Sequence, residues 1–152
     1  VGIMRYDRRS KDLVYKLDLV DDLPKTVLVP DHLLQVFLNI LINAVDASEG
    51  YGNEIQVRSY IEDDIIYVEI ADQGCGIPPN MQNKIFEPFY TTKDVGKGTG
   101  LGLSICYGII EKMGGQLSVE SAVGKGTTFT ISIPLKAGRR KKRNQKRSDT
   151  DA

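Results

Sequence analysis

Residues 65–78 read IIYVEIADQGCGIP, and this stretch decides the predicted fold. Alternate positions at its start are apolar, namely Ile66, Val68 and Ile70, which indicates a strand with one buried face. Asp72 continues the same spacing, so we expect its carboxylate to point into the core, where it is costly unless a specific donor hydrogen-bonds to it. Gly74 and Gly76 leave room for a flat partner beside the backbone. The pattern therefore predicts a slot for a donor on a planar ring, and an adenine amino group is the natural candidate.

A second segment, residues 31–48, predicts a helix. Positions 33–47 are apolar apart from four residues, Gln35, Asn39, Asn43 and Asp46. At about 100° per residue these four fall on one narrow stripe. We therefore expect a buried helix that presents this polar seam to a site.

A third segment, residues 96–103 (GKGTGLGL), runs into an apolar helix that reaches about Met113. A glycine-rich loop at a helix N-terminus offers free backbone N–H groups and the positive end of the helix dipole, which suits phosphate. The loop lacks the Walker pattern, and Leu101 stands where the dinucleotide fingerprint has its third glycine. A purely structural loop is the alternative. Beside Asp72 and the polar seam, we favour phosphate binding by the backbone at Gly98, Gly100, Leu101 and Gly102.

The remaining pattern predicts one mixed sheet of about five strands, covered on one face by about three helices: an α+β, two-layer sandwich. We expect strands at 11–20, 54–61, 65–71, 116–121 and 127–133, helices at 31–48, 78–86 and 100–113, and a polar lid at 87–99.

The 152 residues carry no net charge, but basic and acidic residues are unevenly distributed. Residues 136–152 have a net charge of +6 and no apolar period, against −6 for the rest of the chain. We therefore expect a linker at 1–10, one domain at 11–135 and a disordered basic tail at 136–152. The tail is either a solvated extension or an electrostatic contact for anionic lipid or an acidic partner. The chain has no run of 18 apolar residues, and its start at Val1 suggests a piece of a longer protein.

Five motifs in this order closely resemble the ATP-binding catalytic domain of sensor histidine kinases, over roughly residues 6–135. They are Asn-x-x-x-Asn-Ala, Asp-x-Gly-x-Gly, Phe-x-Pro-Phe, Gly-x-Gly-x-Gly-Leu-Gly-Leu and Gly-x-Gly-Thr. That domain belongs to the superfamily of gyrase, heat-shock chaperone and mismatch-repair ATPases, and has the Bergerat fold. The resemblance implies that ATP and Mg²⁺ are bound by Asn39, Asn43, Asp72, Gly74, Gly76, Ile77, Phe89, Gly98, Thr99, Gly100, Leu101, Gly102, Leu103 and Thr127.

Within this set, the resemblance assigns the metal to Asn43, and a neutral amide oxygen is a suitable ligand for Mg²⁺. The alternative is that Asn39 and Asn43 cap buried polar groups. The hydrolysing branches of the superfamily carry glutamate at the position of Asn39 as a general base, and an amide cannot accept that proton. We therefore expect a site that keeps the γ-phosphoryl for a protein acceptor. Lys93 is the candidate that neutralises the γ-phosphate, with a solvated lid lysine as the alternative; Lys84 and Lys97 are weaker candidates.

The resemblance implies a protein-histidine kinase whose phospho-acceptor histidine lies on a dimerisation domain absent from this chain, and a response regulator as the next partner. His32 lies at the start of the predicted helix and does not fit the acceptor, so we expect no autophosphorylation of the fragment. We expect a monomer without affinity for nucleic acid, in the cytoplasm or on the cytoplasmic side of a membrane-bound sensor. The alternatives are an ATP-hydrolysing superfamily member, a nucleotide-gated regulator of the anti-sigma kind, and, more remotely, a serine kinase.

Overall fold

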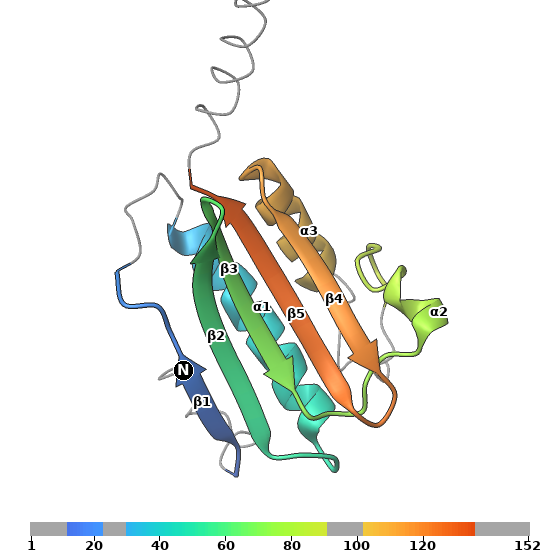
Figure 1. The fold of residues 1–152 in the computed structure, drawn as a ribbon. Helices are drawn as coiled ribbons and strands as arrows, with labels where there is room; N and C mark the ends of the chain where they lie inside the picture. Colours follow the sequence, from blue (N-terminus) through green and yellow to red (C-terminus); the bar gives the residue numbers. More distant parts are fainter. Residues whose placement is uncertain (1–11, 23–29, 91–101, 136–152) are drawn as a thin grey trace, which may run out of the picture.

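A computed structural model describes residues 12–22, 30–90 and 102–135. Its elements, in chain order, are β1 (Val14–Asp18), α1 (Pro30–Ser48), β2 (Glu54–Glu62), β3 (Ile65–Asp72), α2 (Pro79–Gln82), α3 (Gly102–Lys112), β4 (Gln116–Ala122) and β5 (Gly126–Pro134) (Figure 1).

The five strands form one mixed sheet in the order β1-β2-β3-β5-β4. β1 runs parallel to β2, and the other neighbours are antiparallel. Asp63 and Asp64 connect β2 to β3 with φ of 51° and 60°, the left-handed values that a tight hairpin turn requires. The predicted mixed sheet is therefore confirmed.

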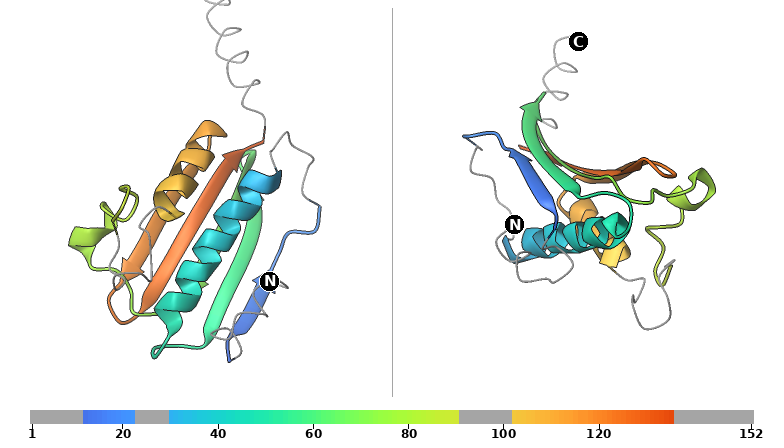
Figure 2. Two further views of the ribbon diagram at one scale, coloured as in Figure 1. Left: turned by 180° about the vertical axis from the view of Figure 1, so that it is seen from behind. Right: turned by 90° about the horizontal axis from the view of Figure 1, so that it is seen from below.

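The core lies between the sheet and the two long helices, α1 and α3, which lie side by side on one face (Figure 2). Inward positions alternate along each strand, as in Phe129, Ile131 and Ile133 on β5. α1 contributes Val36 and Ile40, both fully buried. Burying an isoleucine or valine of this kind stabilises the fold by about 1.5–3 kcal/mol.

Two details differ from the sequence prediction. The helix expected at 78–86 spans only Pro79–Gln82 and lies beside β4, beyond the edge of the sheet (Figure 1). After Gln82 the chain continues as turns, because Ile85 reaches into the core, where its side chain is 7% exposed. α1 was expected to be buried apart from its polar seam, yet the apolar residues Leu34 and Ile42 are 48% and 36% exposed. Leu34 and Ile42 lie on the side of α1 that no described element covers, since its other sides pack against the sheet and α3.

The opposite face of the sheet carries polar and aromatic side chains. Tyr60 stacks on Tyr67 with ring centroids 5.0 Å apart, and the Tyr60 hydroxyl donates to Glu69 Oε1 at 3.0 Å. Such cross-strand pairs stabilise the uncovered face of a sheet. Within the described ranges, no helix has the length and apolar character needed to cross a membrane.

Candidate nucleotide site

A row of side chains crosses the sheet where β3 ends. The strand register places Asp72 opposite Thr127 of β5, and Thr127 opposite Ser121 of β4. On the other side, Asp72 lies opposite Ile55 of β2, which lies opposite Tyr15 of β1. Because directly paired residues point to the same face of a sheet, all five face the helix layer. The register thus puts a carboxylate between two hydroxyls and the apolar Ile55.

Asp72 is 8% exposed, which confirms that its side chain points inward. Its Oδ1 accepts a hydrogen bond from the backbone N–H of Gly74 at 2.8 Å. Burial raises the pKa of the Asp72 carboxyl, and backbone N–H donation from Gly74 and Thr127 opposes that rise. The carboxylate is therefore held by backbone donors and keeps further acceptor capacity for a ligand.

The loop after Asp72 is packed more tightly than the sequence suggested. A Cβ on Gly74 would lie 2.4 Å from the carbonyl oxygen of Ala47, and one on Gly76 would meet the backbone of Ala122. Gly76 also has a φ of +75°. The space that a side chain at either glycine would occupy is filled, by α1 at Gly74 and by the end of β4 at Gly76. Their side-chain positions serve loop packing, and a ligand would meet only their backbone.

Asn39, within the polar seam of α1, faces α3. Asn39 Nδ2 donates to Cys106 Sγ at 3.6 Å, and the Cys106 thiol is directed at the carbonyl of Val36 at 3.9 Å. A Cβ on Gly102, the first residue of α3, would lie 3.9 Å from Asn39 Oδ1. The amide nitrogen of Asn39 is thus used inside the fold, and its oxygen lies beside the N-terminus of α3. Asn43 lies one turn further along the same seam and is half-buried.

A set of hydrogen bonds ties the loop after Asp72 to β4. The backbone N–H of Ile77 donates to Ser121 Oγ at 2.8 Å. Gln82 Nε2 donates to the carbonyls of Ile77 and Ser121, both at 3.0 Å, and Gly124 N–H donates to the carbonyl of Cys75 at 2.8 Å. These bonds fix the loop over the end of the sheet that carries Asp72.

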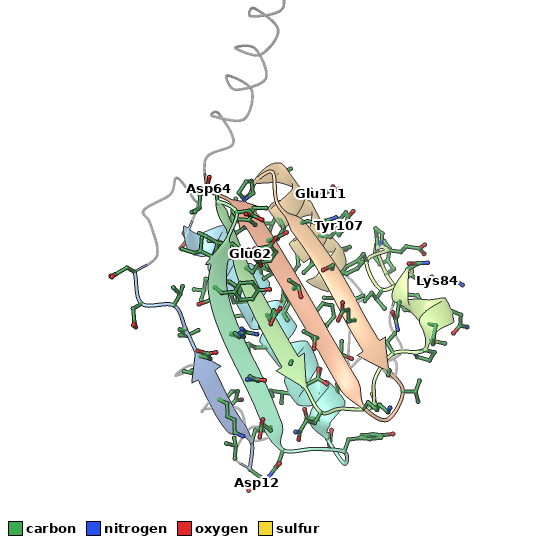
Figure 3. The ribbon with its side chains drawn as sticks, in the orientation of Figure 1. Asp12, Glu62, Asp64, Lys84, Tyr107 and Glu111 are labelled. Atoms are coloured by element: carbon green, nitrogen blue, oxygen red, sulfur yellow. The ribbon has the colours of Figure 1, made fainter. Side chains whose placement is uncertain are left out.

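The structure brings part of the predicted site together. Asp72 and Thr127 are neighbours, and Asn39 lies against Gly102; Leu103 follows on α3, half-buried against the core. Phe89 is 75% exposed, whereas its motif partner Phe86 packs on Phe129 with ring centroids 6.5 Å apart. Lys84 is exposed and lies after α2, beyond β4 (Figure 3). The positions outside the described residues are Lys93, Lys97, Gly98, Thr99, Gly100 and Leu101.

Magnesium fits these residues only as an ion shared with phosphates. Among the described residues no three His, Cys, Asp or Glu side chains gather as a metal site. Magnesium commonly keeps several waters and takes one or two protein ligands beside substrate phosphates. The half-buried amide of Asn43, one turn along α1 from Asn39, suits that role.

A separate hollow of about 350 Å³ lies at the other end of the sheet, lined among others by Tyr107, Glu111 and Ile65. Figure 3 places Tyr107 and Glu111 at the same end as Glu62 and Asp64. Glu111 raises the pKa of the Tyr107 hydroxyl through its charge and a hydrogen bond. This end of the sheet is opposite to the end where β3 reaches Asp72, and none of the predicted site residues line it.

The family model for histidine kinase-, DNA gyrase B- and HSP90-like ATPases matches residues 28–137. The chain belongs to this family. It is 40% identical to Sporulation kinase E of Bacillus subtilis over 144 residues, which cover 95% of this chain and 19% of that kinase. It therefore spans about a fifth of the length of that curated relative.

Solved structures extend the likeness to the fold. The catalytic domain of histidine kinase ThkA, in a nucleotide-free form, has a TM-score of 0.75 and 30% identity, covering 88% of this chain and 86% of that one. Full-length ShkA in complex with AMPPNP has a TM-score of 0.73 and 27% identity, covering 88% of this chain and 28% of that one. The resemblance to sensor histidine kinase catalytic domains and the predicted fold are confirmed.

Sequence reasoning missed Ser121, Gln82 and the role of Cys106. The signal for Ser121 was available, since it is polar at an inward position that follows Leu117 and Val119. Cys106 is a free thiol, and its contact with Asn39 joins residues 67 positions apart. Local spacing gives no indication of such a contact.

Proposed function

We propose that this chain binds MgATP between the end of β3 and the N-terminus of α3, and acts as the ATP-binding part of a sensor histidine kinase. In the full-length protein, the γ-phosphoryl group passes to a histidine on a dimerisation domain, and from there to an aspartate of a response regulator. The family match and the similarity to sensor kinases support this assignment. ShkA, whose complex contains AMPPNP, supports an adenine nucleotide as the ligand.

The observation that carries the proposal is the buried carboxylate of Asp72, which in the described part of the chain is held by backbone N–H groups of its own loop and of β5. An ionised carboxylate accepts hydrogen bonds and cannot donate them, so it selects a donor such as the exocyclic amino group of adenine. Thr127 lies beside it and contributes a hydroxyl to the same edge of the base.

The phosphates then extend toward α3. The first N–H groups of a helix have no partner within it, and the dipole favours negative charge at that end. Asn43 would hold Mg²⁺, which when bound neutralises part of the phosphate charge. Asn39 would contact a phosphate or a metal-bound water through its amide oxygen. Lys93 and the backbone from Gly98 to Leu101 complete the proposed phosphate contacts.

Asn39 distinguishes a kinase from a hydrolase. Its amide nitrogen is directed at Cys106, and an amide does not take a proton from water. Phosphoryl transfer depends mostly on positioning and charge stabilisation, so the site keeps ATP until an acceptor histidine is presented. We expect slow hydrolysis of ATP by the chain alone.

Isothermal titration calorimetry with Mg²⁺ and a non-cleavable ATP analogue tests the binding step. We expect saturable heat with the wild-type chain, strong loss of affinity in Asp72→Asn, and weaker, magnesium-dependent loss in Asn43→Asp. Mixing the chain with labelled ATP and a polypeptide that carries the dimerisation helices tests transfer. Acid-labile phosphate on that polypeptide supports a kinase; rapid steady-state hydrolysis without it would favour an ATPase. An absence of heat in the wild-type titration would remove the proposal.

A further inference from the structure

Ser121 lies at the meeting point of three segments. It is the last inward-facing residue of β4, and its Oγ has three polar contacts. The N–H of Ile77 lies at 2.8 Å, the carbonyl oxygen of Gly126 at 2.9 Å and the Oγ1 of Thr127 at 2.8 Å. Thr127 in turn lies opposite Asp72 on the sheet. Ser121 is therefore one residue removed from the carboxylate that would bind the base.

The protons in this cluster can be counted. A serine hydroxyl has one proton and two lone pairs. The N–H of Ile77 can only donate to Ser121, and the carbonyl of Gly126 can only accept from it. If the Ser121 proton goes to Gly126, the contact between the two hydroxyls is satisfied when Thr127 donates to Ser121. This arrangement satisfies all three contacts, since Ser121 then donates once and accepts twice.

The consequence for Thr127 is a fixed hydroxyl direction. Its proton is used on Ser121, so Thr127 offers lone pairs to a base that lies against Asp72. An ionised Asp72 also offers lone pairs. Two neighbouring acceptors suit the amino group at position 6 of adenine, which has two protons, and they repel the carbonyl oxygen that hypoxanthine and guanine carry there.

We propose that Ser121 is a positioning residue that fixes the Thr127 hydroxyl as an acceptor and thereby makes the site select 6-aminopurine over 6-oxopurine nucleotides. This inference rests on the proposed nucleotide site. Removing the Ser121 hydroxyl releases the Thr127 proton, and Thr127 can then rotate to donate to a carbonyl oxygen. The difference in affinity between 6-aminopurine and 6-oxopurine nucleotides should then decrease, because the Thr127 hydroxyl donates to the 6-oxo group instead of repelling it.

Gln82 provides a matched structural control. It ties the same loop to the same strand, since its Nε2 donates to the carbonyls of Ile77 and Ser121. These bonds go to backbone carbonyls and not to either hydroxyl, so loss of Gln82 loosens the junction without changing the direction in which the Thr127 hydroxyl donates. A loosened junction should weaken ATP and ITP binding by the same factor.

The test is calorimetry of ATP and of inosine triphosphate, which carry the same triphosphate, against the full chain with Mg²⁺. We expect Ser121→Ala to reduce the ratio of the ITP to the ATP dissociation constant by about five- to tenfold, the equivalent of one hydrogen bond. Ser121→Thr keeps the hydroxyl and should keep the ratio. Gln82→Ala should change both constants and leave the ratio near that of the wild type.

A double-mutant cycle tests whether Ser121 acts through Thr127. In a Thr127→Val background, which has no hydroxyl to orient, Ser121→Ala should not change the ratio further. If Ser121→Ala unfolds the chain, Ser121→Cys fills the same space with a weak acceptor and gives the same comparison. The inference about Ser121 is overturned if the ratio of the ITP to the ATP dissociation constant is unchanged in the folded Ser121 variant. It is also overturned if Ser121→Ala changes that ratio equally in the Thr127→Val background. Neither result affects the proposed nucleotide site. Failure of the wild-type chain to bind ATP overturns the proposed function instead.

Discussion

Replacing Gly74 by alanine should destabilise the domain, while the same replacement at Gly108 should stabilise it. At Gly74 the added Cβ would lie 2.4 Å from the carbonyl oxygen and 2.5 Å from the carbonyl carbon of Ala47 on α1. At Gly108, within α3, a Cβ meets nothing within 4 Å. The two positions thus compare one chemical change in a filled and in an open environment.

The magnitude at Gly74 follows from what must move. Carbon contacts are favourable near 3.5–4.0 Å, so the loop would shift by roughly 1 Å away from α1. Such overpacking costs about 1–3 kcal/mol. The shift also stretches the hydrogen bond from Cys75 N–H to the Ala47 carbonyl, now 3.0 Å, for about 1 kcal/mol more. Alanine restricts the unfolded chain, which offsets about 0.4–1 kcal/mol.

The expected net loss is about 2–3 kcal/mol, or a melting temperature lower by roughly 10 °C for a domain of this size. Gly108→Ala should gain about 0.5–1 kcal/mol, because glycine in a helix interior is less favourable than alanine by that amount. Urea and thermal unfolding followed by circular dichroism measure both. If Gly74→Ala loses less than about 0.5 kcal/mol, or both variants lose the same stability, the close packing of this loop on α1 is refuted.

Three further predictions concern buried polar groups. Because burial raises the pKa of Asp72 in the folded state, its protonated form favours folding, and that contribution is lost as pH rises through the raised pKa. Asp72→Asn should therefore be more stable than the wild type near neutral pH, and the difference in the free energy of unfolding should shrink as the pH is lowered. The nucleotide affinity of the wild type should decrease as the pH is lowered, because the carboxylate becomes protonated. Unfolding and calorimetry across a pH series measure both, and a stability difference that grows in acid contradicts the reasoning. Cys106→Ala leaves the amide nitrogen of Asn39 without its sulfur partner and should weaken MgATP binding several-fold, with Cys106→Ser closer to wild type, in the same calorimetric assay. Tyr15 has a buried hydroxyl for which the described residues provide no partner, so Tyr15→Phe should raise the free energy of unfolding by about 1 kcal/mol in urea titrations; a loss of that size would reveal a partner.

Local pattern predicted the parts of this fold that depend on neighbours in sequence. The strand that ends in Asp72 and the long helix expected at 31–48 are confirmed, because period-2 and period-3.6 burial directly reflect backbone geometry. The helix expected at 78–86 was too long because tertiary packing of Ile85 and the bonds of Gln82 decide where that segment turns. The strand expected at 11–20 spans only Val14–Asp18 at the edge of the sheet, and Leu17 within it and Leu19 just after it are about half exposed.

The site was harder to predict than the fold, because it depends on contacts between residues far apart in the sequence. The sequence identifies Asp72 as a buried carboxylate, but not the contacts that set its surroundings. Those contacts join distant positions: Ile77 with Ser121, 44 residues apart, and Asn39 with Cys106, 67 apart. The glycines of the loop illustrate the limit, since Gly74 signals a close approach without indicating whether a ligand or α1 approaches. In the structure, α1 makes the close approach to Gly74, through Ala47.

The register across the sheet explains why the base would be read on one side of Asp72. Toward β5 and β4 its neighbours are Thr127 and Ser121, which are linked by a hydrogen bond of 2.8 Å. Toward β2 its neighbour is Ile55, fully buried and unable to bond to a base edge. A polar group on that side would compete for the carboxylate and lower its selectivity for a ligand donor. Ile55 places no such competitor on that side, so in the proposed site a purine amino group would donate to the acceptor capacity that Asp72 keeps, and the hydroxyl pair beside it would determine which purine is accepted.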